Sequence, residues 1–211
     1  MRQRKNGPFR GRPYRCPFRA DDPAVTIPGL FAGAAVPDQM KAPAIMSFAI
    51  QPAMPGDEAA IETLIDASFG EGRRTRTVYR FRDGVAPLPG LTFIARDPGG
   101  RTLGSIAFWP VRLPDGKIVP LLGPLAVQPD LRGYGIGRAL VTHGLTATRL
   151  QGVPAVLIVG DPGYYAPFGF SVPPVAGLAL PGPVSPLTFM GLEFKPGTLS
   201  ALSGEVLPAK D

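Results

Sequence analysis

The sequence predicts an α/β fold built on a mixed, mostly antiparallel central sheet with helices on both of its faces. Three observations lead to this prediction. Short apolar segments bounded by Pro and Gly follow one another as strands, two segments have helical periodicity, and one strand segment is apolar throughout, as in a strand covered on both faces. A chain of 211 residues is long enough for one well-buried domain.

The domain is expected to begin with a strand and a helix. Residues 48–53 read as the strand, and residues 54–70 as the helix, which Gly70 closes. Four apolar residues of this helix share one face: Ile61, Leu64, Ile65 and Phe69. The polar, arginine-rich segment 71–84 is predicted to form a second helix.

Three consecutive strands are expected to follow as a meander, because their apolar stretches are separated by the turn sequences "PGG" and "PDG". They span residues 91–97, 102–113 and 118–129. A glycine-rich turn then opens a helix. The apolar segment "AVLIVGD" predicts a central strand, "GYYAPFGF" a short helical segment, and "LTFMGLEF" a further strand.

Composition limits the class of protein. No apolar run reaches the roughly 18 to 20 residues of a membrane span, and no signal-peptide core follows the first arginines, so we expect a cytoplasmic protein without membrane contact. Cys16 is the only cysteine and His143 the only histidine, which excludes a disulfide framework and an ordinary structural zinc site. We therefore expect no metal.

The net charge of +6 is concentrated at the N-terminus. Residues 1–45 hold eight Lys or Arg and three Asp or Glu, whereas the remainder holds fourteen and thirteen. This basic segment is rich in Pro and Gly, so we predict a disordered tail or, since a compact strand and helix follow Met46, a stretch upstream of the true translation start. The domain then comprises residues 46–211. Its near-neutral balance disfavours a function in nucleic-acid binding.

The stretch "QPDLRGYGIGRAL" contains three glycines at alternate positions between two arginines, just before an expected helix. A phosphate-loop NTPase needs Lys and then Ser or Thr after the last glycine, and the dinucleotide fingerprint needs G-x-G-x-x-G, so neither motif fits. Missing Cβ atoms and free N–H groups at a helix N-terminus favour an anion there. The stretch predicts a pyrophosphate site, and a purely structural tight turn is the alternative.

This stretch resembles the acetyl-CoA-binding motif of the GNAT superfamily of N-acetyltransferases, R/Q-x-x-G-x-G/A. A second segment, "GDPGYYAPFGF", is similar to the tyrosine segment that ends in Gly-Phe in the same superfamily. The resemblance covers residues 47 to about 210 and is closest to the YhbS-like bacterial group. It implies the acyl-CoA N-acyltransferase fold, acetyl-CoA as cosubstrate and N-acetyltransferase activity.

The resemblance also implies roles for individual residues. Backbone groups of the strand before the turn would hold the pantetheine arm, and this strand segment maps onto Leu125, Ala126 and Val127. A bulge at Gly123 and Pro124 would splay this strand from the next. The cofactor-binding turn would comprise Arg132, Gly133, Tyr134, Gly135, Ile136, Gly137 and Arg138.

In such enzymes a deprotonated amine attacks the acetyl carbonyl directly, and a tyrosine protonates the departing thiolate. Tyr165 occupies the matching position, with Tyr164 as the alternative and core packing as a further interpretation of both. No carboxylate lies in the strand where many relatives have a glutamate, so Asp161 is the candidate base, although an Asp before Pro-Gly more often caps a turn or helix. Ordered water is a further alternative.

His143 falls on an expected helical stripe, which favours a packed histidine over a base. The other residues of that stripe are Ile136, Leu140, Ala147 and Leu150. Segment 71–84 should lie over the acceptor end of the cleft, and its five arginines would either steer an acidic substrate or, as we favour, form a solvated face.

The acceptor is expected to be a small-molecule amine or a peptide amine, and a homodimer is compatible with these expectations. The alternative function is a non-catalytic acyl-CoA-binding or regulatory module of the same fold.

Overall fold

The structure, a computed structural model, describes residues 47–75 and 77–210. The predicted tail therefore lies outside the described residues. The larger sheet runs in the order β1-β2-β3-β4-β5-β7, and β9 pairs with β3. Its strands are β1 (Ala49–Pro52), β2 (Thr92–Arg96), β3 (Thr102–Arg112), β4 (Ile118–Val127), β5 (Ala155–Val159), β7 (Phe189–Glu193) and β9 (Leu207–Pro208). A small second sheet pairs β6 (Leu178–Ala179) with β8 (Gly204–Glu205).

The larger sheet is mixed and mostly antiparallel, which confirms the predicted fold class. Strands β1 to β4 pair in succession as antiparallel neighbours, and the predicted meander is β2-β3-β4. Only β4 and β5 run parallel in this sheet, and β7 returns antiparallel to β5. The parallel pair is joined by helix α2 (Ile136–Leu150), as a crossover between parallel strands requires.

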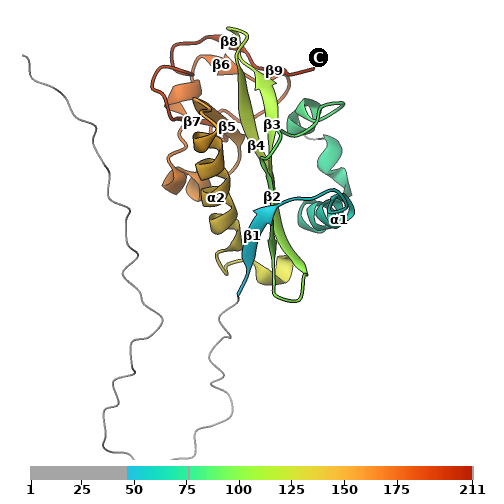
Figure 1. Ribbon diagram of the computed structural model, residues 1–211. Coiled ribbons are helices and arrows are strands. Elements are labelled where there is room, and N and C mark those ends of the chain that lie inside the picture. The colour runs from blue at the N-terminus through green and yellow to red at the C-terminus, as the bar shows by residue number, and fades with distance from the viewer. Residues whose placement is uncertain (1–46, 76, 211) are drawn as a thin grey trace, which may run out of the picture. The chain divides into compact units, whose positions relative to one another are not determined.

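Helices cover both faces of the sheet. Helix α1 (Glu58–Phe69) lies against one face and α2 against the other (Figure 1). The short helix α3 (Pro162–Tyr165) follows β5. Five 3-10 helices complete the described structure: Glu71–Thr75, Thr77–Phe81, Pro129–Leu131, Ala166–Phe168 and Pro173–Val175. Within the described residues, no helix combines the length and apolar character that crossing a membrane requires.

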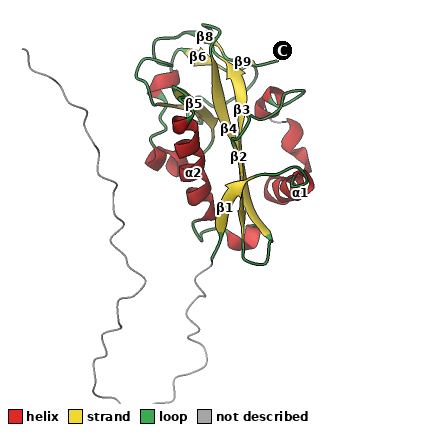
Figure 2. Ribbon diagram, in the orientation of Figure 1, coloured by secondary structure: helices red, strands yellow, loops and turns green. Residues whose placement is uncertain are grey.

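The segment after α1 differs from the prediction. In place of one helix over residues 71–84, the chain forms the two 3-10 helices Glu71–Thr75 and Thr77–Phe81, on the same side of the sheet as α1 (Figure 2). The β-branched Thr77 and Val78 have low α-helix propensity. The segment is instead held by side-chain contacts to α1, which place it beside the candidate site.

Helix α2 packs on β2, β3 and β4 with an amphipathic face. Its buried residues are Ile136, Leu140, Val141, Gly144, Leu145 and Thr148. Gly144 is required for this packing because a Cβ at that position would lie 2.5 Å from Cε2 of Phe108. The Phe108 ring is completely buried, so it has little room to move away.

We expect Gly144→Val to lower the free energy of unfolding by about 1–3 kcal/mol, because the added methyl groups overlap the Phe108 ring. Thr142→Val places the same side chain on the exposed face of the same helix, and we expect it to change stability by less than about 0.5 kcal/mol. Urea denaturation followed by circular dichroism measures both values. Equal losses would contradict the packing argument.

Candidate functional site

The candidate site begins where β4 and β5 separate. The two strands pair only at Leu121–Leu157 and Leu122–Ile158. Immediately afterwards β4 contains one more residue than the facing stretch of β3, a bulge at the expected position of Gly123 and Pro124. Gly123 has a φ of 123°, a backbone conformation that residues with a Cβ atom rarely adopt. Among the described strands, none pairs with the β5 side of β4 beyond the bulge.

A cleft of about 780 Å³ opens at this separation. It extends from β4 to the glycine turn, the end of α1 and the tyrosines of α3. The structure brings together ten of the residues predicted for the site, namely Leu125, Val127, Arg132, Gly133, Gly135, Ile136, Gly137, Arg138, Asp161 and Tyr165. Two others are not among the lining residues: Ala126 packs with Leu64 and Ile65 of α1, and Tyr134 is 57% exposed.

The glycine turn presents unbonded amides to this cleft. Gly133 and Gly135 adopt positive φ angles of 89° and 84°, and Gly135 caps α2 without a side-chain hydrogen bond. The first cap bond is donated by the Ala139 N–H to the Gly135 carbonyl at 3.0 Å. Within the described chain, the three preceding N–H groups, at positions 136–138, donate no hydrogen bond to a backbone carbonyl. The first turn of α2 also lacks acidic residues, so this helix end is strongly electropositive.

Two tyrosines of α3 form the opposite wall of the cleft. Their rings pack edge to face, with centroids 4.9 Å apart. The Tyr164 hydroxyl lies over Gly137, where a Cβ would come within 2.6 Å of it. Tyr165 is only 9% exposed and packs against Phe170. Burial raises the pKa of the Tyr165 hydroxyl well above its usual value, and the nearby Tyr164 and Asp161 raise it further.

The two candidate bases occupy different environments. Asp161 lines the cleft, but its Oδ1 also accepts a hydrogen bond from the Gly163 N–H at 3.2 Å and thereby caps α3. His143 lines neither of the cavities described here. Its predicted burial is wrong, because the buried face of α2 runs through Gly144 and leaves His143 exposed, with only a ring-edge contact to Phe93.

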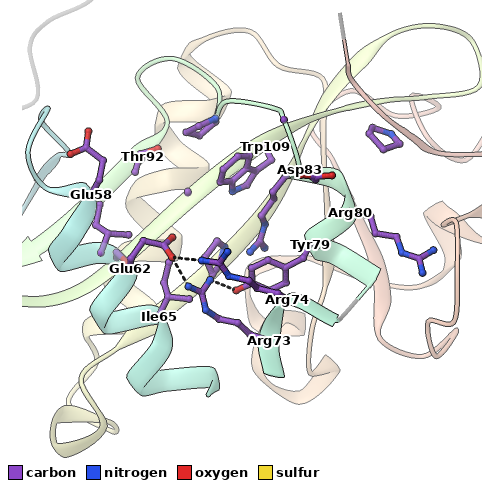
Figure 3. Close-up of a pocket in the computed structure, with 18 of the residues that line it drawn as sticks. Glu58, Glu62, Ile65, Arg73, Arg74, Tyr79, Arg80, Asp83, Thr92 and Trp109 are labelled. Atoms are coloured by element: carbon purple, nitrogen blue, oxygen red, sulfur yellow. Dashed lines mark hydrogen bonds and ion pairs between the residues drawn. The ribbon is translucent and has the colours of Figure 1, made fainter. Parts of the chain in front are cut away.

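A second cavity of about 900 Å³ lies between α1, the 3-10 helices and β3 (Figure 3). It shares Tyr79, Arg82 and Pro124 with the first cleft. These shared residues lie next to the bulge of β4. The two cavities therefore lie next to each other, with Tyr79, Arg82 and Pro124 between them.

Arg73 is buried in the wall of the second cavity, with only 3% of its side chain exposed. Its guanidinium donates to the carboxylates of Glu62 and Asp66, both on α1, and to the Tyr79 hydroxyl at 3.0 Å (Figure 3). The neighbouring Arg74 is 77% exposed. The predicted solvated face is therefore wrong for Arg73, which fastens the 3-10 segment to α1.

Arg82 also departs from that prediction, because its side chain is partly buried. Its guanidinium lies over the ring of Tyr79, 4.6 Å from the centroid, and 5.7 Å from the Trp109 centroid. Burial lowers the pKa of Arg82 to about 10, although the charge interaction and hydrogen bond with Tyr79 act in the opposite direction. Among the described residues, no carboxylate lies within 4.0 Å of it.

Sequence reasoning also missed polar groups on β3. Ser105 and Trp109 lie four residues apart and line the second cavity with Ala107 between them. The period of two in a strand places all three on one face, so a serine within an otherwise apolar strand was an available signal. Within the described part of the chain, no cluster of three His, Cys, Asp or Glu residues could hold a metal ion.

Comparison with known proteins gives consistent matches. The model of the acetyltransferase (GNAT) family matches residues 59–170. The chain is 37% identical over 122 residues to the uncharacterized N-acetyltransferase YhbS of Escherichia coli strain K12, a match that covers 56% of this chain and 71% of YhbS. It is 30% identical over 124 residues to the uncharacterized N-acetyltransferase YjhQ of the same strain, covering 57% and 67%.

Solved structures agree with this likeness. The crystal structure of YhbS from Escherichia coli in complex with CoA superposes with a TM-score of 0.65 at 30% identity, over 76% of this chain and 89% of YhbS. A GNAT family acetyltransferase from Brucella melitensis in complex with acetyl-CoA gives a TM-score of 0.59 at 29% identity, over 77% and 96%.

We expect Arg73→Met to lower the free energy of unfolding by about 2–3 kcal/mol, because it removes charge-assisted hydrogen bonds from a buried site. Arg74→Met alters the adjacent exposed arginine, and we expect a loss below about 0.5 kcal/mol. Guanidinium denaturation of the two variants measures the difference. Similar losses would mean that Arg73 does not anchor the segment.

Proposed function

The chain belongs to the acetyltransferase (GNAT) family, and from this premise we propose that it transfers the acetyl group of acetyl-CoA to a primary amine by direct attack in a ternary complex. The observation that carries the proposal is the cleft at the separation of β4 and β5, which ends at the unbonded amides of α2. In this arrangement an anion site at the glycine turn and an extended channel along β4 belong to one cleft. The crystal structures of both similar proteins contain CoA or acetyl-CoA.

In this proposal the pyrophosphate of acetyl-CoA binds at the glycine turn. Gly133 and Gly135 leave the backbone accessible, and the N–H groups at positions 136–138 point toward the anion. Arg132 and Arg138 add positive charge at the rim, where both side chains are exposed. The pantetheine arm then runs along Leu125 and Val127, and brings the thioester to the bulge.

The reaction transfers the acetyl group in one bond exchange. The amine nitrogen forms a bond with the acetyl carbon, and a β4 backbone N–H stabilises the oxyanion that develops on the carbonyl. The carbon–sulfur bond then breaks, and the CoA thiolate takes a proton from Tyr165. The amine loses its proton to water, which can return one to the tyrosine. Asp161 is a weaker candidate for the base because its carboxylate already caps α3.

The position of Tyr165 in the wall of the cleft supports its role as the acid. Because burial disfavours the phenolate, the hydroxyl is protonated throughout the neutral range and available as a donor. Within the described residues, the hydroxyl has no hydrogen bond that would compete with a sulfur ligand. The half-buried Tyr164 instead places its hydroxyl at the glycine turn, farther toward the pyrophosphate end.

We expect Arg138→Glu to weaken the binding of acetyl-CoA by about tenfold or more, because it replaces a cation with an anion beside the pyrophosphate. The same change should leave the melting temperature unchanged or slightly higher, since a carboxylate suits a helix N-terminus. Calorimetric titration with acetyl-CoA and CoA measures the affinity, with Arg138→Gln as the neutral control. Unchanged affinity would contradict the placement of the pyrophosphate.

We expect Tyr165→Phe to lower kcat by on the order of 10²-fold with little change in acetyl-CoA affinity. A thiol-release assay over a panel of primary amines gives kcat, and calorimetry gives the affinity. A larger loss of kcat in Tyr164→Phe would assign the acid role to Tyr164. Binding of acetyl-CoA with no thiol release from any amine in the wild type would favour an acyl-CoA-binding module over an enzyme.

A further inference from the structure

Three residues that line the second cavity each have one buried polar atom without a hydrogen-bond partner. These atoms are Nε of Arg82, Oγ of Ser105 and Nε1 of Trp109, and no other buried side-chain atom of the described residues lacks a partner in this way. Ser105 is only 2% exposed. Buried polar groups in folded proteins are nearly always paired, so these three atoms call for partners that the described residues do not supply.

The charges around this cavity leave Arg82 without a counterion. Glu62 is held by Arg73, and Asp83 lies at 4.0 Å from Lys210. Glu58 accepts a hydrogen bond from the Gly56 N–H at 2.7 Å, at the start of α1. Arg80 also lines the cavity without an ion pair among the described residues, but it is exposed. The charged residues that line the cavity therefore sum to a net positive charge. Of the two lining arginines without an ion pair in the described chain, Arg82 is the more buried.

The position of Arg82 places this charge beside the reaction centre of the proposed function. A Cβ at Gly123 would lie 3.4 Å from Nη2 of Arg82, so the guanidinium touches the bulge at which β4 leaves β5. This is the point where the thioester is placed. The aromatic rings of Tyr79 and Trp109 stabilise the cation, and Tyr79 also interacts with it through its hydroxyl. Arg82 has no carboxylate partner among the described residues.

We propose that the acceptor is an amine with a carboxylate on the carbon next to the amino group, as in an α-amino acid, and that Arg82 binds this carboxylate. The inference rests on the proposed acetyl transfer and names its substrate class. With the carboxylate against Arg82 at the bulge, the amino group lies two bonds away, beside the thioester.

A carboxylate matches this site for two physical reasons. The planar guanidinium fork of arginine binds a planar carboxylate in a bidentate manner, and the interaction strengthens in a site shielded from water. Pairing with Arg82 also weakens the attraction between the carboxylate and the ammonium group of the acceptor. A free carboxylate stabilises the neighbouring ammonium, so neutralising it lowers the pKa of that ammonium and favours the neutral, nucleophilic amine.

The test compares each of several L-amino acids with its own carboxamide as the acceptor. The pair shares the size and the side chain. The amine of the carboxamide has the lower pKa because it lacks a neighbouring carboxylate, so amine basicity at neutral pH favours the carboxamide, and a preference for the carboxylate form runs against that bias. We expect the wild type to favour the carboxylate form by about tenfold or more in kcat/KM, as a lost charge-assisted hydrogen bond implies. Phosphoethanolamine tests a phosphate-bearing amine in the same thiol-release assay.

Arg82→Met should reduce the preference to within about twofold, while Arg82→Lys should keep part of it because the charge remains. Arg112→Met is the matched control, since Arg112 is exposed at the end of β3 and lines neither cavity. Circular dichroism establishes that each variant is folded. A preference that persists in Arg82→Met would overturn the assignment, as would a preference for phosphoethanolamine.

Two outcomes separate this inference from the function on which it rests. Thiol release at equal rates from amino acids and carboxamides in the wild type would support acetyl transfer and overturn the carboxylate site. Thiol release from no amine would overturn acetyl transfer. In that case calorimetry with N-acetyl amino acids in the presence of CoA decides the site. Binding that Arg82→Met abolishes would support it, and the lack of binding would overturn it.

Discussion

The separation of β4 from β5 is the constraint on which the site depends. A parallel pair that continued to hydrogen-bond would fill the space between the strands with backbone, and no channel would reach the centre of the sheet. The pairing instead ends at Leu122, because Gly123 adopts a φ of 123° and β4 gains one residue relative to β3. Both cavities open at this bulge, and the glycine turn, the α3 tyrosines and Arg82 are arranged around it.

The 3-10 segment after α1 depends in turn on two arginines in contrasting environments. Arg73 is surrounded by acceptors, two carboxylates and a hydroxyl, which together offset the cost of removing a cation from water. Arg82 has aromatic rings in place of carboxylates, and ring faces stabilise a cation less fully than an ion pair does. The first arginine therefore has carboxylate partners within the fold, whereas the second interacts with Tyr79 and Trp109 and has no carboxylate partner among the described residues.

The sequence predicted features set by local chemistry and missed those set by distant contacts. The meander, the bulge at Gly123 and Pro124 and the glycine turn before a helix follow from residue types whose conformational preferences act within a few positions. The burial of Arg73 depends on carboxylates of α1, and that of Arg82 on a tryptophan of β3. Charge composition alone makes both arginines look solvated, because no local pattern identifies the partners.

The absence of a carboxylate from β4 and the lack of a carboxylate partner for Arg82 are related. A side chain at Gly123 would begin 3.4 Å from Nη2 of Arg82, so a carboxylate on this part of β4 would lie within ion-pairing reach of the arginine. Such a pair would neutralise Arg82, and it would lower the pKa of the carboxylate and make it a weaker base. A carboxylate at position 123 would therefore compete with any anion for Arg82, and the glycine at this position leaves the guanidinium without that partner.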